Sequence, residues 1–361
     1  MRKYAELLSF CLAFTAFQCV TIAGSEAPQR MSLTGLCGGV AVDSNGHLRI
    51  NELKRLLDTN PHVSGVLLMA NWKTLEPEEG KFYWDNLDEA IQLARENKRY
   101  YKLKIQPGTS TPHWVYNKGA AVFETKGSNP YRKDTYKQTL RLPIPWDDMY
   151  LREFKRLIDT VGNRYADDPY CAGVVITGAN YQSGESHLPK QPEDRGKWDA
   201  LNYRKHLPDA YKRIIQIFAE AFPHQQICLH VSVPIRRDDG LLDRIIEDAA
   251  KQYPERFTLQ NCQLNGKRDN ISLYSYGLIQ KYVGKLHVGY QSVAYIGSER
   301  QGDTGVSIYN YVRGQGEYWE IWRGNALDPE LCEYLLEEIA RARKIGAAAY
   351  RKELEAMGKS F

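Results

Sequence analysis

The feature that most constrains the fold is a regular alternation of eight apolar, strand-like segments with amphipathic stretches. The strand-like segments are residues 36–42, 63–70, 101–107, 172–178, 226–233, 257–264, 285–292 and 317–322. Between them, apolar residues recur at the three- and four-residue spacing of helices that bury one face. The last connection contains only a short possible helix near residues 306–312. This alternation predicts an α/β fold, a (β/α)8 barrel, and a doubly wound open sheet is the alternative.

Composition and motifs limit the kinds of ligand and partner that the protein is expected to bind. The 361 residues are 43% hydrophobic, which allows a large core, and we expect residues 28–361 to form a single barrel domain. The formal net charge of +4 is spread without a run of Lys or Arg, so no nucleic-acid partner is indicated. No predicted helix begins with a glycine-rich phosphate-binding motif. No His, Cys or Asp set has metal-ligand spacing, so we expect neither a metal nor an organic cofactor.

The N-terminus resembles a targeting segment. Arg2 and Lys3 precede an apolar run over residues 7–23, and small residues follow it. This pattern is typical of a secretory signal peptide, which we place at residues 1–27 with cleavage near residues 23–27. It predicts a secreted, periplasmic or cell-surface protein. An uncleaved N-terminal membrane anchor is the alternative, because the run is almost long enough to span a bilayer.

The cysteines beyond this segment are far apart in the sequence. They are Cys37, Cys171, Cys228, Cys262 and Cys332. No pair has the spacing of a metal site or of a small disulfide scaffold. We expect buried free thiols, with one long-range disulfide as the alternative.

The turn after the second predicted strand carries a recognisable motif. Residues 72–80 read W-x-x-L-E-P-x-E-G, and Trp84 and the pair Leu87-Asp88 follow. This stretch resembles the second strand–loop–helix of clan-A glycoside hydrolases, in particular their β-galactosidase family. The segment "LKIQPGTSTPHWV" (103–115) is similar to the third strand of that family, which ends in a Pro/Thr loop before Pro and Trp. The acidic residues within the turn, Glu76, Glu78 and Glu79, are expected to be solvated rather than catalytic.

The resemblance implies a barrel that cuts glycosidic bonds with two carboxylates. In such families an acid/base follows the fourth strand, and a nucleophile lies at the seventh. One carboxylic acid protonates the leaving oxygen, while the other carboxylate attacks the sugar or supports its positive charge. A separation of roughly 5–5.5 Å gives retention of configuration, and a wider gap admits water and gives inversion. Barrel enzymes hold such groups at the carboxyl ends of their strands.

Glu185 is the only carboxylate just beyond the fourth predicted strand, and we predict that it is the acid/base. The family has an Asn directly before this Glu, whereas here "YQSG" separates Asn180 from Glu185. An exposed loop carboxylate is the alternative. His187 is a candidate to hydrogen-bond Glu185 or a sugar hydroxyl, and a surface His with neither role is the alternative.

The second carboxylate is harder to assign. The seventh predicted strand offers Gln291 and no carboxylate, whereas the eighth carries Glu320 among Trp and Ile. Burying a lone Glu is costly, so this one needs a cation or a polar site. We predict Glu320 as the nucleophile, either because the strand count is shifted by one or because the group lies on a neighbouring strand. A structural Glu paired with Arg323 or another base is the alternative, and Glu299 is the reserve candidate.

A sugar site also needs flat stacking faces and hydrogen-bonding side chains. Candidates at or just after strand ends are Trp72, His113, Trp114, Asn180, Tyr181, His187, Gln291 and Trp322. Together these residues predict a secreted glycoside hydrolase that degrades a poly- or oligosaccharide by a retaining mechanism. A carbohydrate-binding barrel without catalysis, favoured by Gln291, and a sugar-active lyase or transferase are the alternatives.

Overall fold

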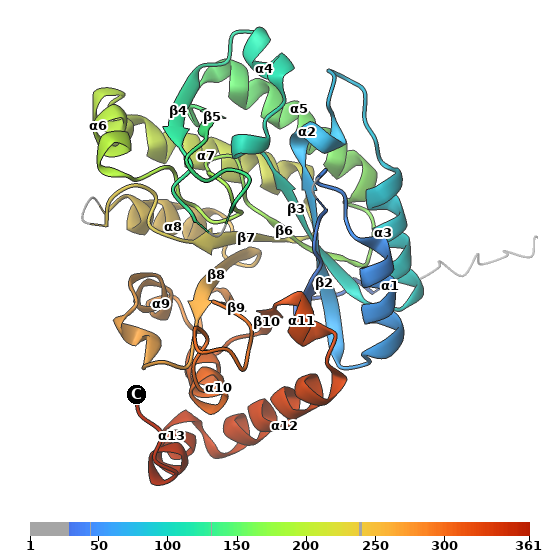
Figure 1. The fold of residues 1–361 in the computed structure, drawn as a ribbon, viewed down its shortest axis with the longest axis vertical. Coiled ribbons are helices and arrows are strands. Elements are labelled where there is room, and N and C mark those ends of the chain that lie inside the picture. The colour runs from blue at the N-terminus through green and yellow to red at the C-terminus, as the bar shows by residue number, and fades with distance from the viewer. Residues whose placement is uncertain (1–28, 44, 131, 238–239) are drawn as a thin grey trace, which may run out of the picture.

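The protein folds into a closed barrel of eight parallel strands surrounded by helices (Figure 1). The computed structural model describes residues 29–43, 45–130, 132–237 and 240–361. The barrel strands, in chain order, are β1 (Gly35–Gly39), β2 (Val63–Asn71), β3 (Tyr100–Gln106), β6 (Cys171–Val175), β7 (Gln226–Val231), β8 (Phe257–Leu264), β9 (His287–Ser292) and β10 (Tyr318–Ile321). Each overlaps one predicted segment. The predicted (β/α)8 fold is therefore confirmed, and the strand count needs no shift: Glu320 lies on the eighth barrel strand.

Barrel closure comes from the first strand, which lies between the second and the last. Gly35 of β1 pairs with Tyr318 of β10, and Gly39 of β1 pairs with Leu67 of β2. An open doubly wound sheet has two unpaired edges, so this pairing excludes that alternative.

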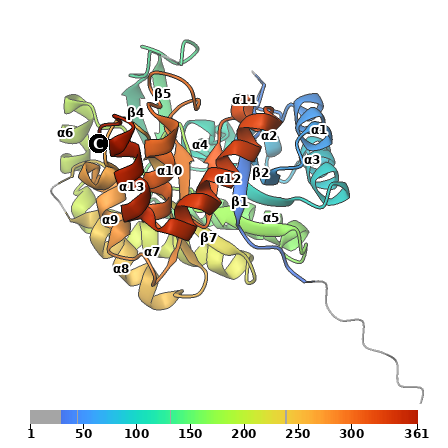
Figure 2. The same cartoon turned by 90° about the horizontal axis from the view of Figure 1, so that it is seen from below.

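Helices cover the outside of the barrel. The longer ones are α1 (Ile50–Thr59), α3 (Asp85–Glu96), α5 (Asp148–Tyr165), α7 (Tyr203–Ala221), α8 (Leu241–Gln252), α10 (Thr304–Arg313), α12 (Pro329–Ile345) and α13 (Ala347–Ala356). Shorter ones are α2 (Trp72–Leu75), α4 (His113–Asn117), α6 (Pro192–Ala200), α9 (Tyr274–Gln280) and α11 (Arg323–Ala326). Near the C-terminus, α10, α12 and α13 pack against one another (Figures 1 and 2).

Helix α5 illustrates how the sequence defines these elements. The Asp147 carboxylate accepts a hydrogen bond from the Tyr150 amide and so caps the first turn. Phe154, Leu157 and Val161 then recur at helical spacing and are fully buried. The helix therefore begins at a polar cap and is held to the barrel by one apolar face.

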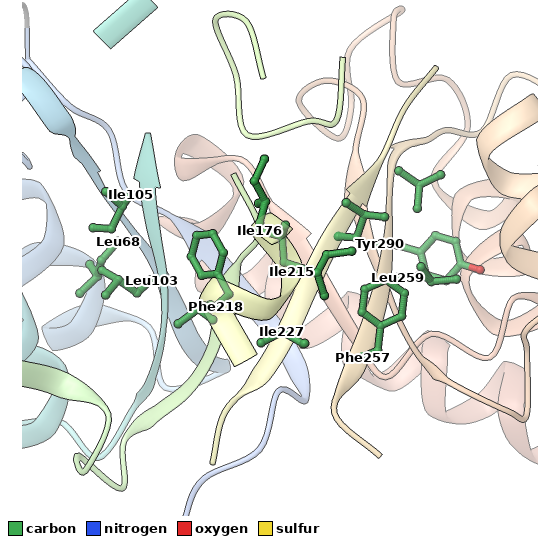
Figure 3. Packing of buried hydrophobic residues seen from close by; sticks show 14 of the residues in the cluster. Leu68, Leu103, Ile105, Ile176, Ile215, Phe218, Ile227, Phe257, Leu259 and Tyr290 are labelled. Carbon is green, nitrogen blue, oxygen red and sulfur yellow. The ribbon is translucent and has the colours of Figure 1, made fainter. Parts of the chain in front are cut away.

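The core has an outer layer between strands and helices, and an inner layer within the barrel. Leu103 and Ile105 of β3 belong to the outer layer, which also contains Ile227 of β7 and Phe218 of α7 (Figure 3). Side chains alternate along a strand, so the residues on either side of Leu103 face the barrel interior instead. That alternation sends Lys102 inward.

Glu76 corrects one prediction, because it is fully buried rather than solvated. Its carboxylate accepts hydrogen bonds from Trp72 Nε1 at 2.9 Å, from the Gly80 amide at 2.8 Å and from Arg156 Nη2 at 2.6 Å. The Glu of the L-E-P motif therefore fastens the turn after β2 to α5. Glu78 and Glu79 are exposed, as expected.

The predicted signal segment, residues 1–27, lies outside the described residues. Within the described part of the chain, no helix combines the length and the apolar character needed to cross a membrane. The five cysteines among the described residues are all buried and free, so the expectation of buried thiols is confirmed.

Candidate active site

A cavity of about 880 Å³ opens at the carboxyl ends of the barrel strands. Its walls come from the segments after β3, β6, β7, β8, β9 and β10. A further wall comes from the antiparallel hairpin of β4 (Val122–Lys126) and β5 (Thr139–Pro143), which contributes Thr125 and Arg132. This is where a barrel of this class holds its chemistry.

The loop after β6 carries Glu185 into the cavity. Asn180 shapes this loop, because its side chain accepts from the Gly178 amide at 3.0 Å and donates to the Ser183 carbonyl at 2.7 Å. The Ser186 amide then donates to the His230 carbonyl of β7 at 2.9 Å. The "YQSG" spacer is thus an ordered turn that places Glu185 beside the end of β7.

Glu185 is partly open to the cavity, with 29% of its side chain exposed. His187 Nδ1 lies 3.4 Å from its Oε2. Burial alone would raise the pKa of the Glu185 carboxyl, but His187, Lys190 and Lys104 outweigh that effect and lower the pKa below its usual value. The carboxylate form is therefore favoured at neutral pH, which suits a base and restricts an acid to lower pH.

Glu320 lies beneath the cavity floor, with 1% of its side chain exposed. Its Oε1 accepts a hydrogen bond from Gln291 Nε2 at 2.6 Å. Its Oε2 accepts from Lys102 Nζ and from Gln260 Nε2, each at 3.2 Å. Gln291 itself lines the cavity, so it separates Glu320 from the open space above.

Lys102 is the cation that balances Glu320 inside the barrel. It is fully buried, and its Nζ also lies 3.1 Å from His230 Nε2 and 3.2 Å from Tyr318 Oη. Burial opposes its charged form, but the attraction of Glu320 prevails and raises the pKa of Lys102. By contrast, burial together with the nearby lysines lowers the pKa of His230 well below its usual value, so this imidazole is neutral.

This pairing settles which base accompanies Glu320. Arg323, the partner considered from sequence, instead binds Glu52 of α1, with Nη1 and Oε2 3.0 Å apart. Glu320 is therefore paired with a base other than Arg323, and that base is Lys102.

Lys104 of β3 is a second lysine near both carboxylates. It lines the cavity, and the charges of both Glu320 and Glu185 act on it. Burial, however, dominates and lowers the pKa of Lys104 below its usual value. Within the described part of the chain, no hydrogen bond or ion pair of its ammonium group is found.

The structure brings about half of the predicted site residues to this cavity: Tyr181, Glu185, His187, Gln291 and Trp322 all line it. Trp322 is 42% exposed. Its Nε1 is fixed by a 2.8 Å hydrogen bond to the Ser292 carbonyl, which leaves an indole face free for stacking.

Other predicted residues lie elsewhere. Trp72 is fully buried and packs edge-on against Trp114, whose Nε1 donates to the Glu76 carbonyl at 3.2 Å. His113 lines a separate hollow of about 820 Å³ beside the β4–β5 hairpin. Asn180 is buried within its own loop, as described above. The reserve candidate Glu299 is exposed and is not among the lining residues.

Sequence reasoning missed the charged and polar groups that enclose the carboxylates. The chief ones are Lys102, Lys104, Arg132, Lys190, His230, Gln260 and Arg300. The sequence does indicate Lys102 and Lys104, because two polar residues that are two positions apart in a barrel strand lie on the same, interior face. No group of three His, Cys, Asp or Glu side chains among the described residues is arranged to hold a metal ion.

Comparison with known proteins places this geometry in a family context. Residues 59–220 match the glycoside hydrolase 42 family model, described as beta-galactosidase. The matched segment runs from the end of α1 to α7 and includes the predicted motif and Glu185. The resemblance to a clan-A glycoside hydrolase family is therefore confirmed.

Two curated β-galactosidases are similar to parts of this chain. One, from Clostridium perfringens, is 28% identical over 195 residues, which are 50% of this chain and 26% of that protein. The other, from Halorubrum lacusprofundi, is 29% identical over 103 residues, 28% of this chain and 14% of the relative. With the family match, these relatives support the resemblance to glycoside hydrolases. The chain matches only about a quarter or less of their length.

The crystal structure of a β-galactosidase from the psychrophilic Marinomonas ef1 shares the fold. The match has a TM-score of 0.52 and 12% identity, and covers 89% of this chain and 61% of that one. At this identity the likeness concerns the barrel alone.

Proposed function

We propose that this protein hydrolyses a glycosidic bond of a poly- or oligosaccharide in the cavity at the carboxyl ends of its strands. The observation that carries the proposal is the position of Glu185, which opens into that cavity from the fourth barrel strand, the place implied by the family resemblance. Trp322 supplies a stacking face on the opposite wall. Tyr181 and His187 add polar groups near the carboxylate.

Glu185 acts as acid/base in this proposal, and Glu320 acts as the second carboxylate of a retaining mechanism. Three donors, from Gln291, Lys102 and Gln260, orient the Glu320 carboxylate. Because Gln291 separates Glu320 from the cavity, its side chain must turn aside before Glu320 can reach an anomeric carbon. Only then would the two carboxylates flank one bond, as retention requires.

The direct test is turnover on a panel of nitrophenyl glycosides and polysaccharides. Glu185→Gln and Glu320→Gln should each lower kcat by several orders of magnitude, whereas Glu299→Gln, an exposed carboxylate outside the lining, should leave it unchanged. Unchanged turnover in either of the first two variants removes that residue from the mechanism. The anomer released, followed by NMR, distinguishes retention from inversion, and an unsaturated product would indicate a lyase.

A second candidate function is carbohydrate binding without cleavage, and Gln291 favours it. This amide stands at the seventh barrel strand, where the resemblance implies the nucleophile, while Glu320 is buried and fully hydrogen-bonded. If catalysis has been lost, wild type will bind glycans without cutting them, and Gln291→Glu should restore measurable hydrolysis. Hydrolysis by wild type at ordinary enzyme rates excludes this candidate.

We also propose that the protein is exported. The charged and apolar pattern of residues 1–27 supports export. Expression of the full chain and of a chain beginning at residue 28, followed by cell fractionation, tests it. The full chain should leave the cytoplasm, and the truncated chain should remain there. Equal distribution of the two chains contradicts export through this segment.

A further inference from the structure

Cationic side chains outnumber carboxylates around the cavity. Four of them line it: Lys104, Arg132, Lys190 and Arg300. The lining carboxylates are Glu185 and Asp194. Asp194 is 3% exposed and accepts a hydrogen bond from Thr125 Oγ1 at 2.9 Å, so little of its oxygen surface faces the cavity.

None of the four cations has an ion pair within the described part of the chain, although many others on the surface do. Lys190 donates only to the Val233 carbonyl, at 3.3 Å. Nearby, by contrast, Arg236 pairs with Asp199 at 2.6 Å, and Lys118 pairs with Glu153 at 2.8 Å. Carboxylate partners are thus scarce around this cavity, and the charge of its lining is predominantly positive.

Lys104 gives the strongest evidence, because it is partly buried in the cavity wall and has no ion pair within the described residues. A Cβ added to Gly184 would lie 2.7 Å from Lys104 Cδ, which shows how tightly the loop after β6 packs against this side chain. Its ammonium group is therefore available to an anionic group of a ligand bound in the cavity. The Glu185 carboxylate attracts the Lys104 ammonium group, but its Oε2 already lies 3.4 Å from His187 Nδ1.

We propose that the sugar bound in this cavity carries an anionic substituent, either a uronic-acid carboxylate or a sulfate ester. This inference rests on the proposed function and names its substrate class. A hollow lined by one sign of charge focuses the field and attracts a ligand of the opposite sign. Lys104 would meet the anion next to Glu185, while Arg132 and Arg300 would bind it, or its neighbour along the chain, through their planar guanidinium groups.

Binding of matched acidic and neutral sugars tests this inference independently of cleavage. Galacturonate and glucuronate are each compared with their methyl esters, and galactose sulfate is compared with galactose, by ligand-observed NMR titration of the wild-type protein. These monosaccharides have no glycosidic bond to lose. Polygalacturonate and its methyl ester, and a sulfated galactan and its desulfated form, are compared by affinity gel electrophoresis.

We expect at least one acidic member to bind about tenfold more tightly than its neutral partner, with the preference falling as salt rises. Lys104→Met and Arg300→Gln should each reduce this preference, whereas Lys54→Met, on the exposed face of α1, should preserve it. Preference for the carboxylates or for the sulfates identifies the anion. Lys104→Met replaces a side chain that has no ion pair within the described residues, so it should unfold at about the same temperature as wild type.

Two results overturn the inference. One is equal or tighter binding of every neutral partner, and the other is an acidic preference that survives both cavity variants. If neutral sugars are preferred and cleaved, the charge inference fails while the hydrolase proposal stands. If acidic sugars bind tightly but no glycoside is cleaved, the substrate class stands and hydrolysis fails.

Discussion

Lys102 and Glu320 are opposite charges enclosed in the barrel interior, joined at 3.2 Å. A buried ion pair gives little net stability, because desolvation offsets the attraction, but removing one partner leaves a charge alone. The same pair holds Glu320 in place below Gln291. The structural role of the ion pair can therefore be separated from any catalytic role of Glu320.

We predict that Lys102→Met lowers the free energy of unfolding by about 3–5 kcal/mol, because it leaves Glu320 buried without its cation. The double variant Lys102→Met/Glu320→Leu should recover most of that loss. Urea unfolding of both variants measures the coupling, with Lys54→Met as a surface control. A Lys102→Met variant as stable as wild type contradicts the assignment.

The pKa of Lys102 is raised in the folded state, and this fixes the sign of its pH dependence. The stabilisation is complete below the ordinary lysine pKa and is lost as the pH rises through the higher folded value. It therefore does not weaken the protein at neutral pH.

His187 should set the alkaline limit of activity. The lowered pKa of Glu185 means that its acid form, which must protonate the leaving oxygen, disappears as the pH rises from the acidic range. Activity should thus increase as the pH falls toward the lowered pKa of Glu185. Removing His187 takes away a group that favours the carboxylate, so the pKa of Glu185 rises in His187→Ala.

The alkaline limb of kcat/KM against pH should then move to higher pH in His187→Ala. Lys54→Met serves as the control with an unchanged profile. A limb that moves to lower pH, or stays in place while Glu185→Gln remains inactive, contradicts the role given to His187.

At the scale of elements, the loop that carries Glu185 depends on the 3-10 turn after β3. Gly108 begins that turn with a φ of +61°, and the Thr109 amide donates to the Tyr181 carbonyl at 3.1 Å. A Cβ on Gly108 would lie 2.2 Å from that same carbonyl oxygen and 2.6 Å from the Asn180 carbonyl oxygen. The turn after β3 and the loop after β6 therefore fit together only with glycine here.

Gly108→Ala should displace the Glu185 loop, and we expect a loss of more than about 2 kcal/mol of stability together with most of the activity. Gly119→Ala is the matched control, because Gly119 also has a positive φ, +102°, but its Cβ would meet nothing within 4 Å. The control should lose only about 1–2 kcal/mol and keep its activity. Thermal unfolding and turnover of both variants check this. Equal effects of the two substitutions exclude the loop contact as the cause.

The sequence predicted strands and helices better than it predicted the site. All eight barrel strands follow from apolar runs, and α5 and α7 follow from helical spacing. Its position after a strand end predicts Trp72 at the site, but the side chain turns into the core beside α5. Spacing along the chain does not reveal that direction. The cavity was only partly foreseen because Arg132 and Lys190 reach it from loops with no periodic pattern.

At the scale of the whole molecule, the five described cysteines are distributed among β1, β6, β7, β8 and α12 and are all buried. Burial raises the pKa of the Cys37 thiol to about 12 and that of Cys332 to about 11. The thiolate, not the thiol, is the reactive form. Four of the cysteines are thus protected both by enclosure and by their protonation state, and Cys262, which lines the cavity, is 5% exposed.

These thiols should report on global unfolding. In a background with Cys11 and Cys19 replaced by Ser, the native protein should leave all five unlabelled by a water-soluble thiol reagent at neutral pH. In urea, all five should become reactive over the same concentration range in which far-UV circular dichroism is lost. Mass spectrometry counts the labels. Rapid labelling of a single cysteine in the native protein contradicts the burial described for that position.

The position of β1 between β2 and β10 has a consequence for synthesis. The first barrel strand pairs with the last, so all eight strands must leave the ribosome before the seam can close. Until then Gly35–Gly39 has one unpaired edge, and the carboxylate on β10 has not yet met Lys102. Contacts of such long sequence separation make folding slow. A chain that remains open this long during translation stays available to chaperones and to any export machinery that requires an unfolded polypeptide.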